Sequence, residues 1–82
     1  GIHVPPDGVG EEKGQHFVFV IKPGQGQQGT IEKRTVTIGE LTEEGFLVKE
    51  GLSPGEMVAT SGLQLLMDGM AVKLLNDPVK EW

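Results

Sequence analysis

Three glycines within residues 24–29 (GQGQQG) have the spacing of the G-x-G-x-x-G loop that binds dinucleotide phosphates, and with Thr30 they come close to a P-loop. A dinucleotide loop needs a helix after its glycines, because the helix N-terminus holds the phosphates. The residues that follow Gly29 are rich in threonine, valine and isoleucine, which favour a strand, and no lysine precedes Thr30 as a P-loop requires. We therefore interpret residues 24–29 as a flexible hairpin tip.

The side chains that could bind a metal are few and far apart. His3 and His16 have no acidic residue in helical register with either of them, and the chain contains no cysteine. Three methionines could form a soft copper(I) site. Met57, Met67 and Met70 occupy apolar positions of the expected elements, however, so the pattern predicts core packing instead.

Candidates for catalysis are also weak. Most carboxylates fall in expected turns, where they are solvated and unsuited to acid–base work; they are Glu11, Glu12, Glu43, Glu44, Glu50, Glu56 and Asp68. Ser53 and Ser61 lie outside any G-x-S-x-G motif. Lys13 lies in a loop, as in lipoyl carrier domains, but lacks the neighbours that those domains show. The sequence predicts no catalytic residue, no cofactor and no metal.

Length and charge narrow the class of protein further. The 82 residues suffice for one domain, and the net charge is −5. The seven basic residues are scattered, which argues against nucleic acid and against a polybasic membrane surface as partners. No apolar stretch approaches a transmembrane helix, so we expect no direct membrane insertion by this segment. We also expect the chain to be a fragment of a longer protein.

The elements that must position these residues are short. Glycine and proline interrupt the sequence often, which predicts a mainly β domain. We expect a small roll or barrel-like arrangement of about six short, mostly antiparallel strands, with one short helix near 61–67 that Ser61 caps. The expected strands cover residues 3–5, 16–22, 30–39, 46–48, 57–60 and 70–75.

Three local features refine this expectation. Strand 16–22 is apolar on both faces, which is typical of a central strand. In strand 30–39, Ile31 has the opposite parity to Val36, so we expect a bulge or a twist near Lys33 and Arg34. Residues 52–56 (LSPGE) have the sequence of a type II turn.

The C-terminal half carries a recognisable pattern. Residues 50–72 read EGLSPGEMVATSGLQLLMDGMAV. The motif in this segment consists of Gly51, Leu52, Pro54, Gly55, Val58, Gly62, Leu66, Asp68, Gly69 and Val72. This segment resembles the closing segment of periplasmic adaptors, also called membrane fusion proteins, of resistance-nodulation-division efflux pumps. Upstream stretches 4–9, 17–20 and 33–39 resemble the same family, so the resemblance covers about residues 2–75. This sequence departs from the family pattern in two places. Its loop at 22–29 is long, and Gly8 stands where relatives usually have alanine.

The resemblance implies a function and a location. Residues 1–75 would be the membrane-proximal domain of an adaptor and residues 76–82 a tail. This domain would be a non-catalytic structural part of a multidrug or solute efflux pump, in the periplasm and associated with the inner membrane. Its implied partners are an inner-membrane transporter, neighbouring adaptor protomers and, through other domains of the full-length chain, an outer-membrane channel.

The residues that make these contacts are not marked by the motif. Exposed candidates are Gln27 in the hairpin tip, Lys33 and Arg34; an ordinary solvated strand face is the alternative for the last two. Two other functions stay open. One is the equivalent domain of an ABC-exporter or metal-efflux adaptor, and the other is a small ligand- or metal-binding β domain.

Overall fold

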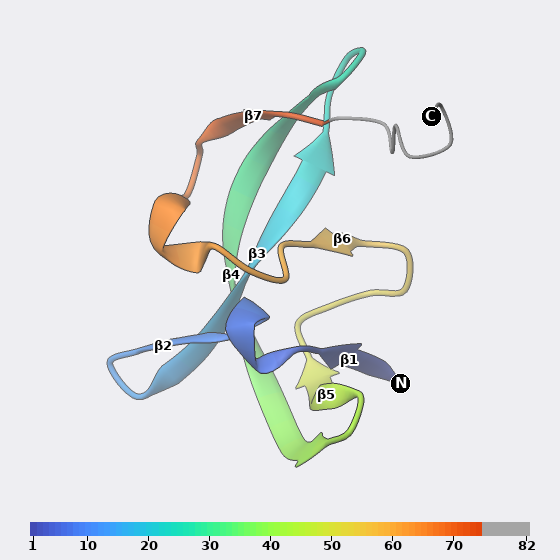
Figure 1. Ribbon diagram of the computed structural model, residues 1–82, viewed down its shortest axis with the longest axis vertical. Coiled ribbons are helices and arrows are strands. Elements are labelled where there is room, and N and C mark those ends of the chain that lie inside the picture. The colour runs from blue at the N-terminus through green and yellow to red at the C-terminus, as the bar shows by residue number, and fades with distance from the viewer. Residues whose placement is uncertain (75–82) are drawn as a thin grey trace.

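The computed structural model describes residues 1–74 and consists of β-strands joined by short turns (Figure 1). The mainly β class is confirmed, with seven strands in place of the expected six. The strands are β1 (Ile2–Val4), β2 (Gly10–Glu12), β3 (Gln15–Pro23), β4 (Gln28–Thr42), β5 (Gly45–Glu50), β6 (Met57–Val58) and β7 (Ala71–Lys73). Two single turns of 3₁₀-helix, η1 (Pro6–Gly8) and η2 (Leu63–Leu65), are the only helical segments within residues 1–74.

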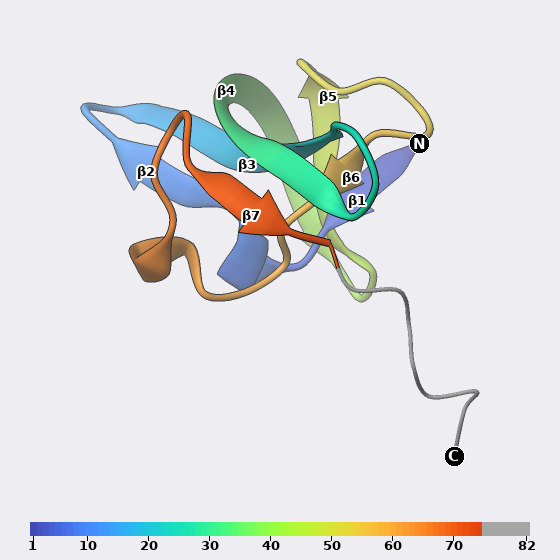
Figure 2. The ribbon, with the colours of Figure 1, turned by 90° about the horizontal axis from the view of Figure 1, so that it is seen from above.

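All strand pairs are antiparallel and form one open, coiled sheet. Its main order is β1-β5-β4-β3-β2, while β6 pairs with β3 and β7 pairs with β4. The molecule is elongated, about 37 × 27 × 22 Å. The hairpin tip between β3 and β4 lies at one end, beside β7, and the β4–β5 turn lies at the other (Figures 1 and 2).

The long strand β4 holds the two halves of the sheet together. Its first half pairs with β3 on one edge and β7 on the other, and its second half pairs with β5. The bulge expected near Lys33 and Arg34 is not there, because pairing with β3 is regular through both residues. The register shifts instead between Thr37 and Leu41, where β4 turns toward β5.

Burial on both faces of the β3–β4 hairpin explains the mixed parity of β4. Val36 belongs to the main core cluster, whereas Ile31 pairs with Ile21 and points to the opposite face. Both side chains are buried, so no bulge is needed to bring them to one side. The expectation that strand 16–22 is central is confirmed by Val18 and Phe19, neighbours on opposite faces that are both buried.

The core is small and built largely from valine. Its buried cluster consists of Val4, Val18, Val20, Val36 and Val48. Around it pack the half-buried side chains of Ile2, Val9, Ile38, Leu52 and Val58. These residues come from β1, β3, β4, β5, β6 and, for Val9 and Leu52, from the connections between strands, so the core links segments that are distant in the sequence.

Several boundaries differ from the expectation. The polar segment expected as a loop at 10–14 forms β2, because it pairs with β3 at Phe17 and His16, and only Lys13–Gly14 makes the turn. The strand expected at 57–60 has two residues. The helix expected near 61–67 is only η2, which begins after Gly62 with φ 73° and receives no side-chain cap from Ser61. Within residues 1–74 there is no helix with the length and apolar character to cross a membrane.

Candidate functional site

Arg34 is the best-anchored charged side chain of the described structure. Position 34 lies in the middle of β4, opposite Val18, and the side chain is 22% exposed. Its Nη1 donates to Glu56 Oε1 at 2.6 Å and to the carbonyl oxygen of Gly51 at 3.2 Å. Its Nη2 donates to Glu32 Oε1 at 2.8 Å. Arg34 therefore ties the central hairpin to the 51–56 loop, and we call this group the Arg34 clamp.

The clamp shifts the ionisation of its members. The pKa of Glu56 lies below its ordinary value, because its carboxylate accepts the backbone N–H of Ser53 and, second, the hydrogen bond from Arg34. The pKa of Glu32 is also lowered, first by Arg34 and then by Lys22. The pKa of Arg34 is raised, chiefly by its hydrogen bond to Glu56. All members of the clamp are thus held in their charged forms.

The loop that Arg34 holds has a tight local structure. The N–H of Glu56 donates to the carbonyl of Ser53 at 3.2 Å, and Gly55 has φ 91°, as expected for a type II turn after Pro54. Gly51 has φ 110°, and a Cβ there would lie 2.8 Å from a methyl carbon of Val36. Glycine is required at position 51 for both reasons.

Lys33 makes a second link between β4 and the rest of the chain. Its backbone N–H donates to Asp68 Oδ1 at 2.8 Å, which holds the 67–70 turn against β4. Its Nζ lies 2.6 Å from Glu12 Oε1 and 4.4 Å from the ring centre of Phe17. The hydrogen bond and charge of Lys33 lower the pKa of Glu12. Gly10 lies directly against the Phe17 ring, where a Cβ would not fit.

The structure thus gives Lys33 and Arg34 intramolecular partners. Neither is an ordinary solvated side chain, and their contact with another protein stays a prediction. Sequence reasoning included Asp68 in the motif but missed Glu56 as the partner of Arg34. Glu56 could have been found from its position, because it is an acidic residue directly after Pro54 and Gly55.

The remaining motif residues line the turns and the edge of the core. Gly62 and Gly69 have positive φ, in line with the turns expected there. Val58, Leu66 and Val72 are half-buried. The expectation of methionine core packing is wrong for Met57 and Met67, whose side chains are 48% and 66% exposed, because Met57 lies in the two-residue strand β6 and Met67 in the connection after η2. Leu41 (56%) and Leu65 (72%) are exposed as well, and sequence reasoning did not single them out.

The hairpin tip is a short, polar turn. The backbone N–H of Gly24 donates to the backbone carbonyl oxygen of Gln28 at 2.8 Å, and the backbone N–H of Gln28 donates to that of Gln25 at 3.1 Å. Gly26 has φ 61°. Strand β4 begins at Gln28, so no helix follows the glycines and the arrangement of a phosphate loop is not formed. The chain therefore closes a hairpin at the place where a dinucleotide fold would begin a helix.

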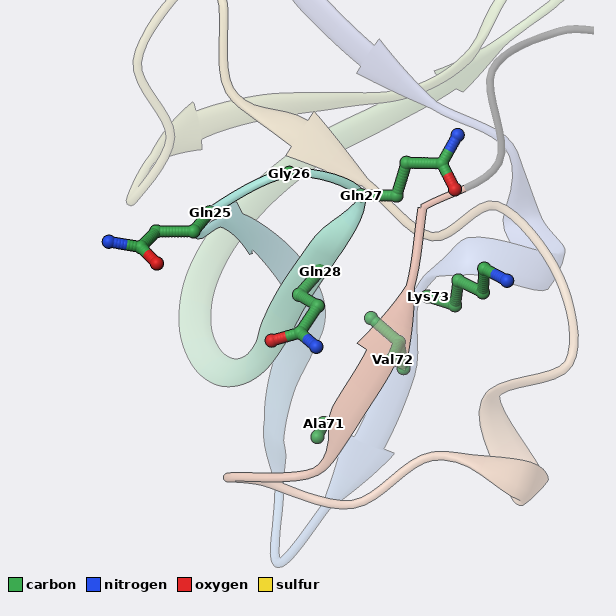
Figure 3. A pocket seen from close by; sticks show the side chains of 7 residues that line it. All are labelled: Gln25, Gly26, Gln27, Gln28, Ala71, Val72 and Lys73. Atoms are coloured by element: carbon green, nitrogen blue, oxygen red, sulfur yellow. The ribbon is translucent and has the colours of Figure 1, made fainter.

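A shallow hollow of about 590 Å³ lies between this tip and β7. It is lined by Gln25, Gly26, Gln27, Gln28, Ala71, Val72 and Lys73. Figure 3 shows Gln25 and Gln27 pointing away from each other, while Gln28 lies beside β7. Three of the lining side chains are neutral amides and Lys73 is the charged one, so the tip can offer hydrogen bonds to a protein surface.

The histidines do not come together with other ligands. His3 lies in β1 opposite Leu47, and His16 lies in β3 between Glu11 and Val36. In residues 1–74 no three His, Cys, Asp or Glu side chains gather as a metal site would need. The charged groups that do meet serve to join strands and loops. Fold and surface together define a small all-β scaffold domain.

The family follows from comparison with known proteins. The model described as RND MFPs, C-terminal permuted SH3 domain, matches residues 1–65. The chain belongs to this family of membrane fusion proteins, which confirms the resemblance described above. As a member of this adaptor family, it is a non-catalytic domain.

Three curated relatives illustrate the similarity. The toluene efflux pump periplasmic linker protein TtgD of Pseudomonas putida is 36% identical over 73 residues, which is 88% of this chain and 18% of the relative. The multidrug resistance protein MexA of Pseudomonas aeruginosa is 33% identical over 73 residues, again 88% of this chain and 18% of the relative. The multidrug resistance protein MdtA of Cronobacter turicensis is 33% identical over 61 residues, 74% of this chain and 14% of the relative.

The chain therefore spans less than one fifth of the length of these relatives. No solved structure gives a significant match.

Proposed function

We propose that this chain is the membrane-proximal domain of a longer periplasmic adaptor that belongs to an efflux pump for drugs or other solutes. Residues 1–75 form this domain and residues 76–82 its tail, which lies outside the described residues. The domain contacts an inner-membrane transporter and neighbouring adaptor protomers. It helps to couple the transporter to an outer-membrane channel, which other domains of the adaptor reach.

The family match over residues 1–65 carries this proposal. The names of the relatives support it, since TtgD is a periplasmic linker protein of a toluene efflux pump and MexA a multidrug resistance protein. The Arg34 clamp supports a scaffold role, because it fixes the 51–56 loop to the sheet. Surface contact is the activity that such a domain can perform.

A domain exchange tests this proposal. The matching segment of MexA is replaced by residues 1–75 of this chain, and drug susceptibility and co-purification with the transporter are measured in cells that lack MexA. We expect the chimera to restore at least part of the resistance and to co-purify with the transporter. The matched control carries Gly51→Val, which cannot adopt the local backbone. A stable chimera with no more activity than this control would contradict the function.

The proposed contact at the hairpin tip has its own test. A photo-reactive amino acid replaces Gln27 in the complete adaptor, and adducts are sought by mass spectrometry. We expect an adduct with the transporter. The control position is Gln15, an exposed glutamine at the opposite end of β3. Absence of an adduct at 27, or equal adducts at both positions, would remove the tip from the contact surface.

A further inference from the structure

Two of the three methionines of the chain are exposed, and the main core cluster contains none of them. Met67 is 66% exposed and Met57 is 48% exposed, whereas Met70 is half-buried. Sulfur-containing side chains are the ones that mild oxidants modify, and methionine is converted to its sulfoxide. The chain contains no cysteine, so no thiol within it competes for the oxidant. Exposure should therefore decide which of the thioether groups reacts first.

Met67 lies in the connection between η2 and β7, which runs along the outside of the molecule (Figure 1). The local backbone is held without the help of its side chain. The carbonyl oxygen of Met67 accepts the N–H of Met70 at 3.1 Å, and the next residue, Asp68, accepts the N–H of Lys33. An oxygen atom added to the Met67 sulfur would leave both hydrogen bonds in place.

Met57 is the second accessible thioether. It lies in the two-residue edge strand β6, where it pairs with Ile21. Beside it is a hollow of about 330 Å³, which has room for one more oxygen atom. The hydrogen bonds of the preceding residue, Glu56, go to Arg34 and Ser53, so the Arg34 clamp does not depend on the Met57 sulfur.

Met70 provides an internal comparison because it is the least exposed methionine. Its carbonyl oxygen accepts the N–H of Ile31 at 2.8 Å, and the Ile31 side chain is buried. An oxidant reaches Met70 less often, and reaches it fully only when this segment opens locally. A polar sulfoxide would also disturb the packing around a half-buried side chain. Met70 should therefore be the slow site.

We propose that Met67 and Met57 are the oxidation sites of this domain, and that they take up oxygen from a peroxide without loss of the fold. The lone pair of the thioether sulfur attacks one oxygen of hydrogen peroxide, and the O–O bond breaks as the S–O bond forms. The proton of the transferred hydroxyl passes to the departing hydroxide, which leaves as water. The sulfur loses two electrons and the peroxide gains them.

The product at each site is methionine sulfoxide, which methionine sulfoxide reductases convert back to methionine. The order of reaction is Met67, then Met57, then Met70, as their exposure dictates. The two exposed thioethers thus consume oxidant reversibly, while the hydrogen bonds that hold the 51–56 loop and the 67–70 turn persist.

Peptide mapping tests this inference in the complete, purified adaptor treated with dilute hydrogen peroxide. Fragment mass spectra assign each added oxygen atom to one methionine. We expect Met67 to react first, Met57 second, and Met70 at least about threefold more slowly than Met67. A methionine sulfoxide reductase should then remove the oxygen from positions 67 and 57. Any order in which Met70 is not the slowest, or sulfoxides at 67 and 57 that the reductase does not reduce, would overturn the inference.

Leucine variants and hydrogen exchange provide the second readout. Met67→Leu with Met57→Leu keeps the side-chain volume and should abolish the early uptake of oxygen by this domain, whereas the control Met70→Leu should leave it unchanged. After oxidation of Met67 and Met57, amide protection at Ile31 and Lys33 should equal that of the untreated adaptor. Early uptake that persists in the double variant, or protection lost with the first oxygen, would overturn the inference.

Discussion

The guanidinium group of Arg34 and the carboxylate of Glu56 lie 2.6 Å apart, although 22 residues separate them in the sequence. The same guanidinium reaches Gly51, so one side chain holds both ends of the 51–56 loop. Charge-assisted hydrogen bonds of this kind are short and strong, and a planar fork holds several acceptors at once. Arg34 thus joins the 33–39 stretch to Gly51 of the C-terminal motif and to Glu56.

Substitution Arg34→Lys tests the clamp. A lysine keeps the charge but cannot bridge Gly51, Glu32 and Glu56 together, so we expect Tm to fall by roughly 4–8 °C for a domain of this size. Thermal unfolding followed by circular dichroism measures this change. The control is Lys33→Arg, where the partly exposed ion pair with Glu12 and the cation over Phe17 are both retained, so Tm should hardly change. Equal Tm values for both variants would show that the fork does not matter.

Acid should weaken the domain through the same carboxylates. The pKa values of Glu56 and Glu32 are lowered in the folded state, whereas an unfolded glutamate titrates at about 4.3. Their contribution to stability is therefore fully present above about pH 5 and is lost as the pH falls through the lowered folded values.

Urea unfolding between pH 3 and 7 measures this effect, and Glu56→Gln should make the free energy of unfolding less dependent on pH in the acidic range. A curve for the variant that parallels the wild type would refute the assignment.

Substitution Gly8→Ala should destabilise the domain even though relatives are expected to carry alanine there. In this chain a Cβ at position 8 would lie 2.9 Å from the carbonyl oxygen of Ala59 and 2.9 Å from a methyl carbon of Val4. Overpacking of this kind costs about 1–3 kcal/mol. The control Gly24→Ala meets only ordinary contacts at the hairpin tip and should be neutral. Chemical denaturation of both variants decides the matter, and an unchanged Gly8→Ala would mean that η1 can move.

Asp68 should protect the amide of Lys33 from exchange with solvent. In Asp68→Ala the acceptor of this N–H is removed, so hydrogen exchange at Lys33 should accelerate about tenfold or more for a lost bond of about 1.4 kcal/mol. Asp68→Asn keeps a carbonyl oxygen in the same place and should restore most of the protection. NMR exchange rates give the answer, and equal rates in Asp68→Ala and the wild type would contradict this role.

Local signals in the sequence were sufficient for part of the fold. The apolar run in residues 16–22 identified the central strand, since β-branched and aromatic residues on both faces of a strand favour burial of both faces. Pro54 followed by Gly55 identified a turn for steric reasons alone. The polar strand β2 could not be recognised in this way, because only its pairing with Phe17 and His16 makes it a strand.

The site was less predictable because it depends on which strands become neighbours. Exposure was assumed for Arg34, yet its side chain is 22% exposed, and its acceptors lie in a loop whose position the sequence does not give. Met57 looked like a core residue because apolar patterning does not reveal that a strand is short and at an edge. The exposed Leu41 had a signal in its polar neighbours, residues 40 and 42–44.

Strand β4 runs from the hairpin tip to the β4–β5 turn and has 15 residues. Three other strands, β3, β5 and β7, pair with it. Force that pulls the two ends apart would pass along this one covalent strand, and its ladders with β3 and β5 would be loaded in shear, with many hydrogen bonds resisting together. We therefore expect the domain to resist extension along β4, because both ladders share the load.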